Sequence, residues 1–217
     1  MDNWIFKYHE AIQKKEVIVG VWVRLCFEIL TTGLLNGEWE FNEKKANKAI
    51  KFIENFCHHS EGRSDLLHLE LWQKAIASAI FGIMDKTTGY RQFREVFIIV
   101  ARKNGKTLFA AAIAAYMTYV DGEYGAKVYF LAPKLDQADL VYDAFYQIVQ
   151  SDDELDSITK KRRSDIYIKA FNTSVKKIAF NSKKSDGFNP QMVVNDEMEA
   201  WQGDHGLKQY EVMKSAL

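Results

Sequence analysis

The sequence predicts an α/β protein with a mainly parallel central sheet flanked by helices, preceded by a helical N-terminal subdomain. Three observations support this fold class. Residues 1–60 carry apolar side chains at helical spacing, and from Leu69 onward apolar helices alternate with short strands. The strands are continuous apolar runs, which are typical of parallel strands buried on both faces. We place a boundary near residue 62, between a helical leader at 1–62 and an α/β core at 63–217.

Bulk composition excludes few functions. The 217 residues are 47% hydrophobic, enough for one sizeable core, and Lys+Arg equals Asp+Glu at 29 each, so any nucleic-acid contact must come from local patches. Cys26 and Cys57 form no paired framework, which favours free thiols in a reducing cytosol. No secretory leader and no apolar stretch of membrane-spanning length is evident. We therefore expect an intracellular protein without a membrane partner.

The leader contains two helical stripes. Ile5, Tyr8 and Ile12 recur at helical spacing, and a second stripe comprises Ala46, Ala49, Ile50, Ile53 and Phe56. The segment TTGLLNGEWEFN between them contains two Gly and two Asn, which predicts a loop, and HHSEGRSD ends the second helix.

The core segment predicts alternating elements in a βαβ order. Helices are expected at Leu71–Phe81, Thr107–Val120 and 135–150, and strands at Val96–Val100, Val128–Ala132, Ile166–Ala170, Val175–Phe180 and Met192–Asn195.

A phosphate-binding turn is predicted between the strand at Val96–Val100 and the helix that follows. Asn104–Gly105 make a tight turn, and Lys106–Thr107 open an alanine-rich helix. Backbone N–H groups there would hold phosphates, Lys106 would neutralise the β/γ oxygens and Thr107 would bind Mg²⁺. The usual pattern requires Gly where this chain has Val100, so a plain surface turn of solvated charges is the alternative.

An acidic pair follows the last strand candidate. A carboxylate at the C-terminal end of a parallel strand faces the ligand crevice of an open sheet, so Asp196 can hold Mg²⁺ directly or through water. Glu197 can accept a proton from the attacking water or orient it. Acidic pairs also occur in the first turn of ordinary helices, which is the alternative reading.

Together these residues resemble the large terminase subunits of tailed phages, in the group whose phosphate loop reads A-R-K-x-G-K-[ST]. Here that loop is ARKNGKT, and the segments ANKAIKFIENF, LELWQ, YFLAPKLDQADLVYDAF and DGFNPQMVVNDE follow in family order. The resemblance implies an ATP-hydrolysing, Mg²⁺-dependent P-loop motor that drives double-stranded DNA into a procapsid. It implies adenine recognition by Gln73 and a role for Arg102 at the γ-phosphate. The implied nucleotide contacts are Gln73, Arg102, Lys103, Asn104, Gly105, Lys106 and Thr107.

The resemblance also implies partners and a location. These are double-stranded DNA, the portal protein, the small terminase subunit and a homo-oligomeric ring on the portal, with a monomer in isolation left open. The location would be the host cell cytoplasm, for a phage or prophage protein. Arg162 and Arg163 are candidates for an arginine supplied to a neighbouring subunit, and candidate DNA contacts are Lys160, Lys161, Arg162, Arg163, Lys183 and Lys184.

Two departures from the family qualify these expectations. The family continues from the acidic pair toward a histidine, whereas this chain has Met198–Glu199. The family's coupling motif and nuclease domain would lie beyond Leu217, so this chain alone is not expected to cut DNA. A helicase-like nucleic-acid ATPase and an inactive nucleotide-binding or interaction module remain the alternatives.

Overall fold

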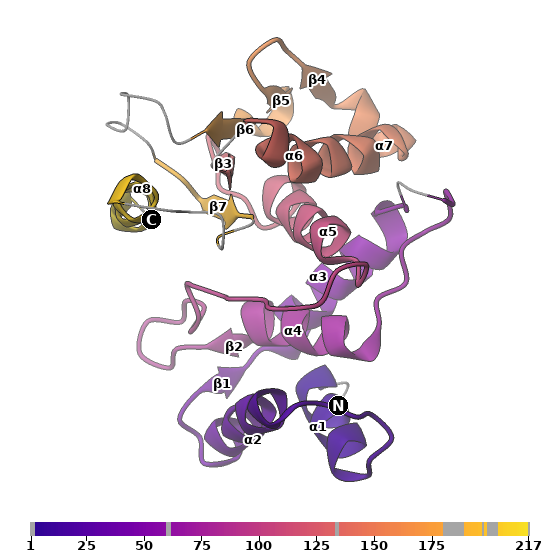
Figure 1. Ribbon diagram of the computed structural model, residues 1–217, viewed down its shortest axis with the longest axis vertical. Helices are drawn as coiled ribbons and strands as arrows, with labels where there is room; N and C mark the ends of the chain where they lie inside the picture. Colours follow the sequence, from indigo (N-terminus) through magenta and orange to yellow (C-terminus); the bar gives the residue numbers. More distant parts are fainter. Residues whose placement is uncertain are drawn as a thin grey trace. The chain divides into compact units, whose positions relative to one another are not determined.

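The computed structural model describes residues 3–59, 62–132, 135–179, 189–196, 198 and 204–216. The chain forms two compact units (Figure 1). Unit 1 comprises Met1–Asn55 and Leu67–Ala101, and unit 2 comprises Phe56–Leu66 and Arg102–Leu217. The domain boundary expected near residue 62 stays a prediction.

Unit 1 is a helical assembly with one short two-stranded sheet. Its elements are α1 (Trp4–Gln13), α2 (Val21–Leu35), β1 (Glu40–Phe41), α3 (Glu43–Phe56), α4 (Leu71–Gly82) and β2 (Ile83–Met84). Strands β1 and β2 pair antiparallel. The predicted stripe Ile5, Tyr8 and Ile12 is buried, and the ring of Tyr8 meets that of Phe27 edge-on at 4.7 Å. This contact joins α1 to α2 and confirms the buried face of the first helix.

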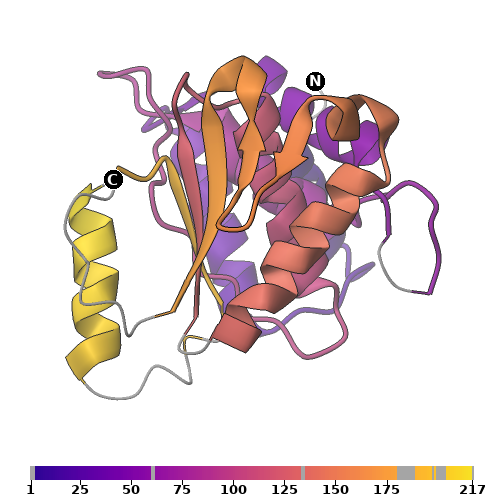
Figure 2. The same cartoon turned by 90° about the horizontal axis from the view of Figure 1, so that it is seen from above.

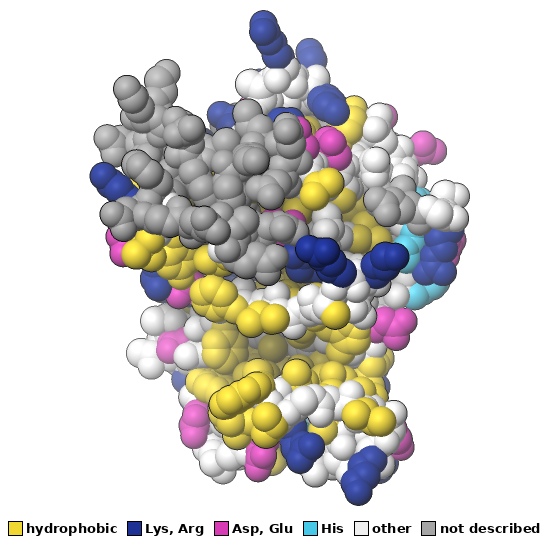
Figure 3. Space-filling model, viewed as in Figure 1, with side chains coloured by type: hydrophobic (Ala, Val, Ile, Leu, Met, Phe, Trp, Pro, Cys, Tyr) yellow, Lys and Arg dark blue, Asp and Glu magenta, His cyan; other side chains and the backbone are white. Residues whose placement is uncertain are grey.

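The outer face of α2 remains apolar and exposed. Trp22 keeps 78% of its surface exposed and Ile29 keeps 54%, although Phe27 and Leu30 on the same helix are buried. Hydrophobic side chains gather over the part of unit 1 where α1 and α2 are drawn (Figures 1 and 3). Helix α2 is therefore apolar on both faces but buried on only one.

The loop predicted for TTGLLNGEWEFN was partly wrong. Helix α2 continues through Leu35, and Gly33 within it packs so closely against Trp39 that an added Cβ would lie 2.6 Å from the indole ring. The Thr31 hydroxyl is also satisfied within the helix, donating to the Phe27 carbonyl at 2.8 Å. Tertiary packing thus outweighs the weak helix propensity of this segment, and the turn is confined to the residues between Leu35 and strand β1.

The strand predicted at Val96–Val100 was also wrong. This segment is irregular, and Ile99 is 96% exposed. A strand needs a neighbour for its backbone N–H and C=O groups, and no described residue pairs with this segment. An apolar run alone therefore did not determine the conformation.

Unit 2 contains the predicted α/β sheet, with strand order β4-β5-β6-β3-β7. The strands are β3 (Lys127–Ala132), β4 (Thr159–Lys161), β5 (Ile166–Ile168), β6 (Thr173–Ala179) and β7 (Met192–Asn195). Strands β6, β3 and β7 are parallel, β5 is antiparallel to β6, and β4 is antiparallel to β5. Four of the five strands consequently run the same way, as the fold class predicted.

Helices cover both faces of this sheet (Figure 2). They are α5 (Lys106–Tyr119), α6 (Leu135–Gln150), the short α7 (Asp153–Ser157) and α8 (Asp204–Ala216). On one face Phe130 of β3 contacts Tyr142 and Phe145 of α6, with ring centroids 6.2 and 5.9 Å apart. On the other face Tyr129 and Leu131 pack against Met213 of α8, and Ile178 and Val193 are packed against this cluster. Burial on both sides explains why β3 is apolar without alternation.

The remaining core predictions were close. The helices at 71–81, 107–120 and 135–150 and the strands at 128–132 and 192–195 are confirmed within a residue. The strand expected at Ile166–Ala170 ends at Ile168, where the 3₁₀ turn η1 (Lys169–Phe171) begins and leads to Asn172 in the left-handed region. The strand expected at Val175–Phe180 begins earlier, at Thr173, and Phe180 lies outside the described residues.

Candidate functional site

The turn before α5 has the backbone conformation that a phosphate loop requires. Lys103 and Gly105 both lie in the left-handed region, with φ of 64° and 70°. Such turns orient successive backbone N–H groups into one concavity that binds anions. Glycine adopts this conformation without a steric penalty, whereas Lys103 is an uncommon non-glycine case that the sequence pattern did not reveal. Asn104 braces the turn by donating from Nδ2 to the Arg102 carbonyl at 3.2 Å.

Helix α5 begins directly after this turn and presents its N-terminus to the same place. Gly105 is the N-cap, and neither a side-chain cap nor an acidic residue occupies the first turn. The N–H groups of that turn and the positive end of the helix dipole therefore favour an anionic ligand. The helix is buried on nearly all sides from Phe109 to Tyr119, whereas the turn before it is exposed.

The acidic strand end lies beside the turn formed by residues 102–107. Strand β7 pairs in parallel with β3, with Asn195 opposite Leu131, and the next residue, Asp196, donates its backbone N–H to the Leu131 carbonyl at 3.2 Å. This register places the Asp196 carboxylate Oδ1 2.9 Å from Nζ of Lys106. The Asp196 side chain is 11% exposed and that of Lys106 is 37% exposed. Two residues that are ninety positions apart in sequence thus form one ion pair.

The oxygen donors at this place fit magnesium. Mg²⁺ in nucleotide sites is usually held by one or two carboxylates together with substrate phosphates and water, rather than by a full protein cage. Asp196 supplies a carboxylate, and Thr107 supplies a hydroxyl on the turn after Lys106. The described residues contain no group of three His, Cys, Asp or Glu side chains that could hold a metal ion.

Other predicted site residues occupy distinct environments. Arg102 is exposed at the start of the turn, and no described carboxylate pairs with its guanidinium. Glu197, the predicted base, and Glu199 lie outside the described residues, as do Lys183 and Lys184. Their roles stay predictions.

Gln73 is placed in unit 1, near the start of α4. It is 6% exposed, and its Oε1 accepts the Glu70 backbone N–H at 2.9 Å in a capping box. This bond stabilises the helix start whether or not a nucleotide is bound. Adenine recognition by the remaining amide donor stays a prediction.

The two arginines proposed to act on a neighbouring subunit, Arg162 and Arg163, differ in their surroundings. Arg162 donates two hydrogen bonds to the buried carboxylate of Asp165, at 2.6 and 2.7 Å, and lies 4.0 Å from the ring of Tyr167. The pairing raises the pKa of Arg162, so the group is permanently charged and structurally engaged. Arg163 is exposed and remains the more available of the two.

Sequence reasoning missed Asn195, which directly precedes the site carboxylate. Its side-chain oxygen is buried, and no described residue donates a hydrogen bond to it. Buried acceptors usually accept a hydrogen bond, so a buried side-chain oxygen without a described donor lowers the stability of the fold. The only signal in the sequence is a polar residue at the end of an apolar strand.

The sheet order, the left-handed glycine turn and the lysine beside a strand-end aspartate define the P-loop ATPase class of fold. The family profile described as "Terminase large subunit, ATPase domain" matches residues 71–215. Because this match covers more than half of the chain, the protein belongs to the terminase large subunit ATPase domain family.

A solved structure shares this fold. The chain is similar to the crystal structure of the HK97 bacteriophage large terminase, with a TM-score of 0.66 and 22% sequence identity. The similarity covers 79% of this chain and 35% of that one, so this chain spans about a third of the HK97 protein. No curated protein sequence matches this chain. Within the described residues, no helix is long and apolar enough to cross a membrane.

Proposed function

We propose that this chain binds and hydrolyses Mg-ATP at the turn formed by residues 102–107 and the end of β7. The observation that carries the proposal is the 2.9 Å ion pair between Lys106 and Asp196, beside a left-handed Gly105 at an uncapped helix N-terminus. A cation and a carboxylate at that position are the two charges that a nucleotide triphosphate and its magnesium require.

The ion pair implies that Lys106 changes its partner when a nucleotide binds. Without phosphate, the ammonium of Lys106 is neutralised by Asp196. When a triphosphate enters, its β/γ oxygens compete for the ammonium, and the carboxylate is released to face the metal. Thr107 and Asp196 would hold the magnesium, which supplies neutralisation of phosphate charge when it is bound.

Hydrolysis then needs a positioned water. Glu197 would accept a proton from this water as its oxygen forms a bond to the γ-phosphorus, while the bond to the β–γ bridging oxygen breaks and ADP leaves. The backbone N–H groups of the turn hold the phosphates in place, and Arg102 would stabilise charge on the γ-phosphoryl group.

The family assignment extends this proposal to a biological role. We propose that hydrolysis drives packaging of double-stranded viral DNA into a procapsid, with the portal protein and the small terminase subunit as partners. The motor would act as a homo-oligomeric ring in the host cytoplasm. The family match favours this role over a helicase-like ATPase.

The test is steady-state phosphate release combined with nucleotide binding. Lys106→Ala should lose nucleotide binding, whereas Glu197→Ala should retain binding and lose turnover. Lys208→Ala on α8 is the matched control, because it removes an exposed lysine away from the turn. Unchanged binding and turnover in both site variants would remove the assignment.

A further inference from the structure

Helix α3 of unit 1 carries a row of lysines on its solvent side. Lys44, Lys48 and Lys51 are separated by four and three residues, so they lie on one face, and Lys45 lies beside them. The opposite face is buried through Ala46, Ala49, Ile50 and Ile53. From Lys44 to Lys51 the helix rises roughly 10 Å.

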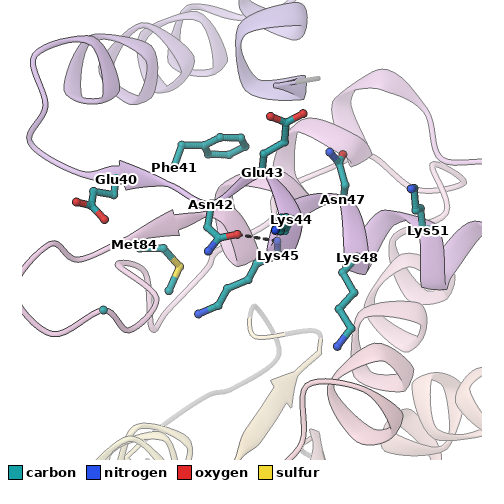
Figure 4. Close-up of a pocket in the computed structure, with 11 residues that line it drawn as sticks. Glu40, Phe41, Asn42, Glu43, Lys44, Lys45, Asn47, Lys48, Lys51 and Met84 are labelled. Atoms are coloured by element: carbon teal, nitrogen blue, oxygen red, sulfur yellow. Dashed lines mark hydrogen bonds between the residues drawn. The ribbon is translucent and has the colours of Figure 1, made fainter. Parts of the chain in front are cut away.

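These lysines line an open groove of about 990 Å³ (Figure 4). Phe41 and Met84 of the two short strands contribute its apolar part, and Asn42 lies at the start of the helix. Lys45 and Lys48 extend from the helix on one side, and Glu43 points to the other (Figure 4). Asn42 Oδ1 accepts the Lys45 backbone N–H at 3.0 Å, so its amide NH₂ is the group left for a ligand.

Two glutamates, Glu40 and Glu43, also line the groove, so its four lysines outnumber its carboxylates. No described carboxylate lies within ion-pairing distance of Lys44, Lys45, Lys48 or Lys51. Lysines three and four residues apart repel one another and destabilise an isolated helix by a few tenths of a kcal/mol per pair. A polyanion in the groove would remove this repulsion and release its own counterions.

The basic run at 160–163 is different. Arg162 is already paired with Asp165, and Nζ of Lys161 lies 3.9 Å from the ring of Tyr146. Half of this run is thus engaged in contacts within the protein, although all four of its residues were among the sequence's candidates for DNA contact. Unsatisfied cations are the better anion site, because binding does not require an existing contact to break.

We propose that the α3 groove binds the phosphate backbone of double-stranded DNA. This rests on the proposed packaging function, which supplies the duplex. Each strand of a duplex carries one phosphate per about 3.4 Å of axis, so a lysine row of roughly 10 Å is long enough to reach several phosphates. The contacts carry no sequence information, as suits a motor that must move along any sequence.

The test compares two charge-neutralised variants of the full chain. Lys44→Gln, Lys48→Gln and Lys51→Gln are combined in one variant, and Lys160→Gln, Lys161→Gln and Arg163→Gln in the control, so each loses three exposed cations. Affinity for a fluorescently labelled 30-base-pair duplex is measured by anisotropy across a range of salt concentrations. Thermal melting confirms that both variants fold.

The α3 variant should bind the duplex on the order of 10–100-fold more weakly. The slope of the logarithm of its binding constant against the logarithm of the salt concentration should become less negative by about 2.7, which is about 0.9 for each lost phosphate contact. The control should change much less. Equal losses in both variants, or no loss in the α3 variant, would overturn the proposal. So would failure of the unmodified chain to bind any duplex, and this outcome leaves the ATPase proposal standing if phosphate release persists.

The phosphates of a nucleotide are the other ligand that could bind the lysines of the α3 groove. Binding of a fluorescent ATP analogue to the α3 variant should equal that of the unmodified chain. If analogue binding falls while duplex binding is retained, the groove serves the nucleotide and the DNA assignment is wrong.

Discussion

Gly105→Ala is the most direct perturbation of the phosphate turn. Gly105 has φ 70° and ψ 20° at the start of α5. An alanine in the left-handed region costs about 1–2 kcal/mol, and its lower entropy in the unfolded chain offsets about 0.4–1 kcal/mol of this. The free energy of unfolding should therefore fall by only about 1 kcal/mol, which corresponds to a drop of roughly 2–4 °C in Tm for a chain of this size.

The effect on nucleotide binding should be much larger. If the turn relaxes to relieve the alanine, one or two N–H groups rotate away from the phosphates, and each hydrogen bond to a charged group contributes about 1.5–3 kcal/mol. Binding of an ATP analogue, measured by titration calorimetry, should weaken by at least about tenfold. The loss of affinity should thus exceed what the loss of stability can explain.

Gly125→Ala is the matched control for this experiment. Gly125 has φ 82° in a turn whose N–H donates to the Phe171 carbonyl at 2.8 Å, and an added Cβ would meet only the Asn172 side chain, at 3.9 Å. It should show the same small loss of stability and unchanged nucleotide affinity. If Gly105→Ala binds the analogue as tightly as the unmodified chain, the turn does not hold phosphates and the reasoning fails.

Three further predictions concern the rest of the fold. Gly33→Ala should lower the urea midpoint by an amount equivalent to about 1–3 kcal/mol, because the added Cβ would overlap Trp39. Gly20→Ala is the control and should leave the midpoint unchanged, because a Cβ there would have no atom within 4 Å. Equal midpoints for the two variants would contradict the α2 packing. Asp165→Asn should cost about 1–2 kcal/mol in the same assay by breaking the paired hydrogen bonds from Arg162, whereas Asp153→Asn on the exposed surface should cost little. In native protein a thiol reagent should modify the exposed Cys26 and spare Cys57, which is buried and whose pKa is raised by that burial. Partial burial also raises the pKa of Cys26, so its labelling rate should keep increasing as the pH rises above the ordinary thiol pKa. Rapid labelling of both thiols would contradict the burial of Cys57.

The sequence by itself determined the α/β class, most of the core elements and the turn at the start of α5. These features are local: apolar spacing fixes which face of a helix is buried, and an Asn-Gly step before a lysine and an apolar helix indicates a turn at a helix N-terminus. The stripe Ile5, Tyr8 and Ile12 and the strand Met192–Asn195 followed from such patterns.

Only the tertiary structure decided what depends on partners distant in sequence. Pairing of β7 with β3 brings Asp196 to Lys106, and contact with Trp39 extends α2 through a segment rich in turn residues. The apolar run Val96–Val100 did not become a strand, since no described neighbour satisfies its backbone. The sequence pattern of α3 indicates which residues point outward, whereas the groove beside its lysines and the distance of those lysines from any described carboxylate are properties of the folded surface.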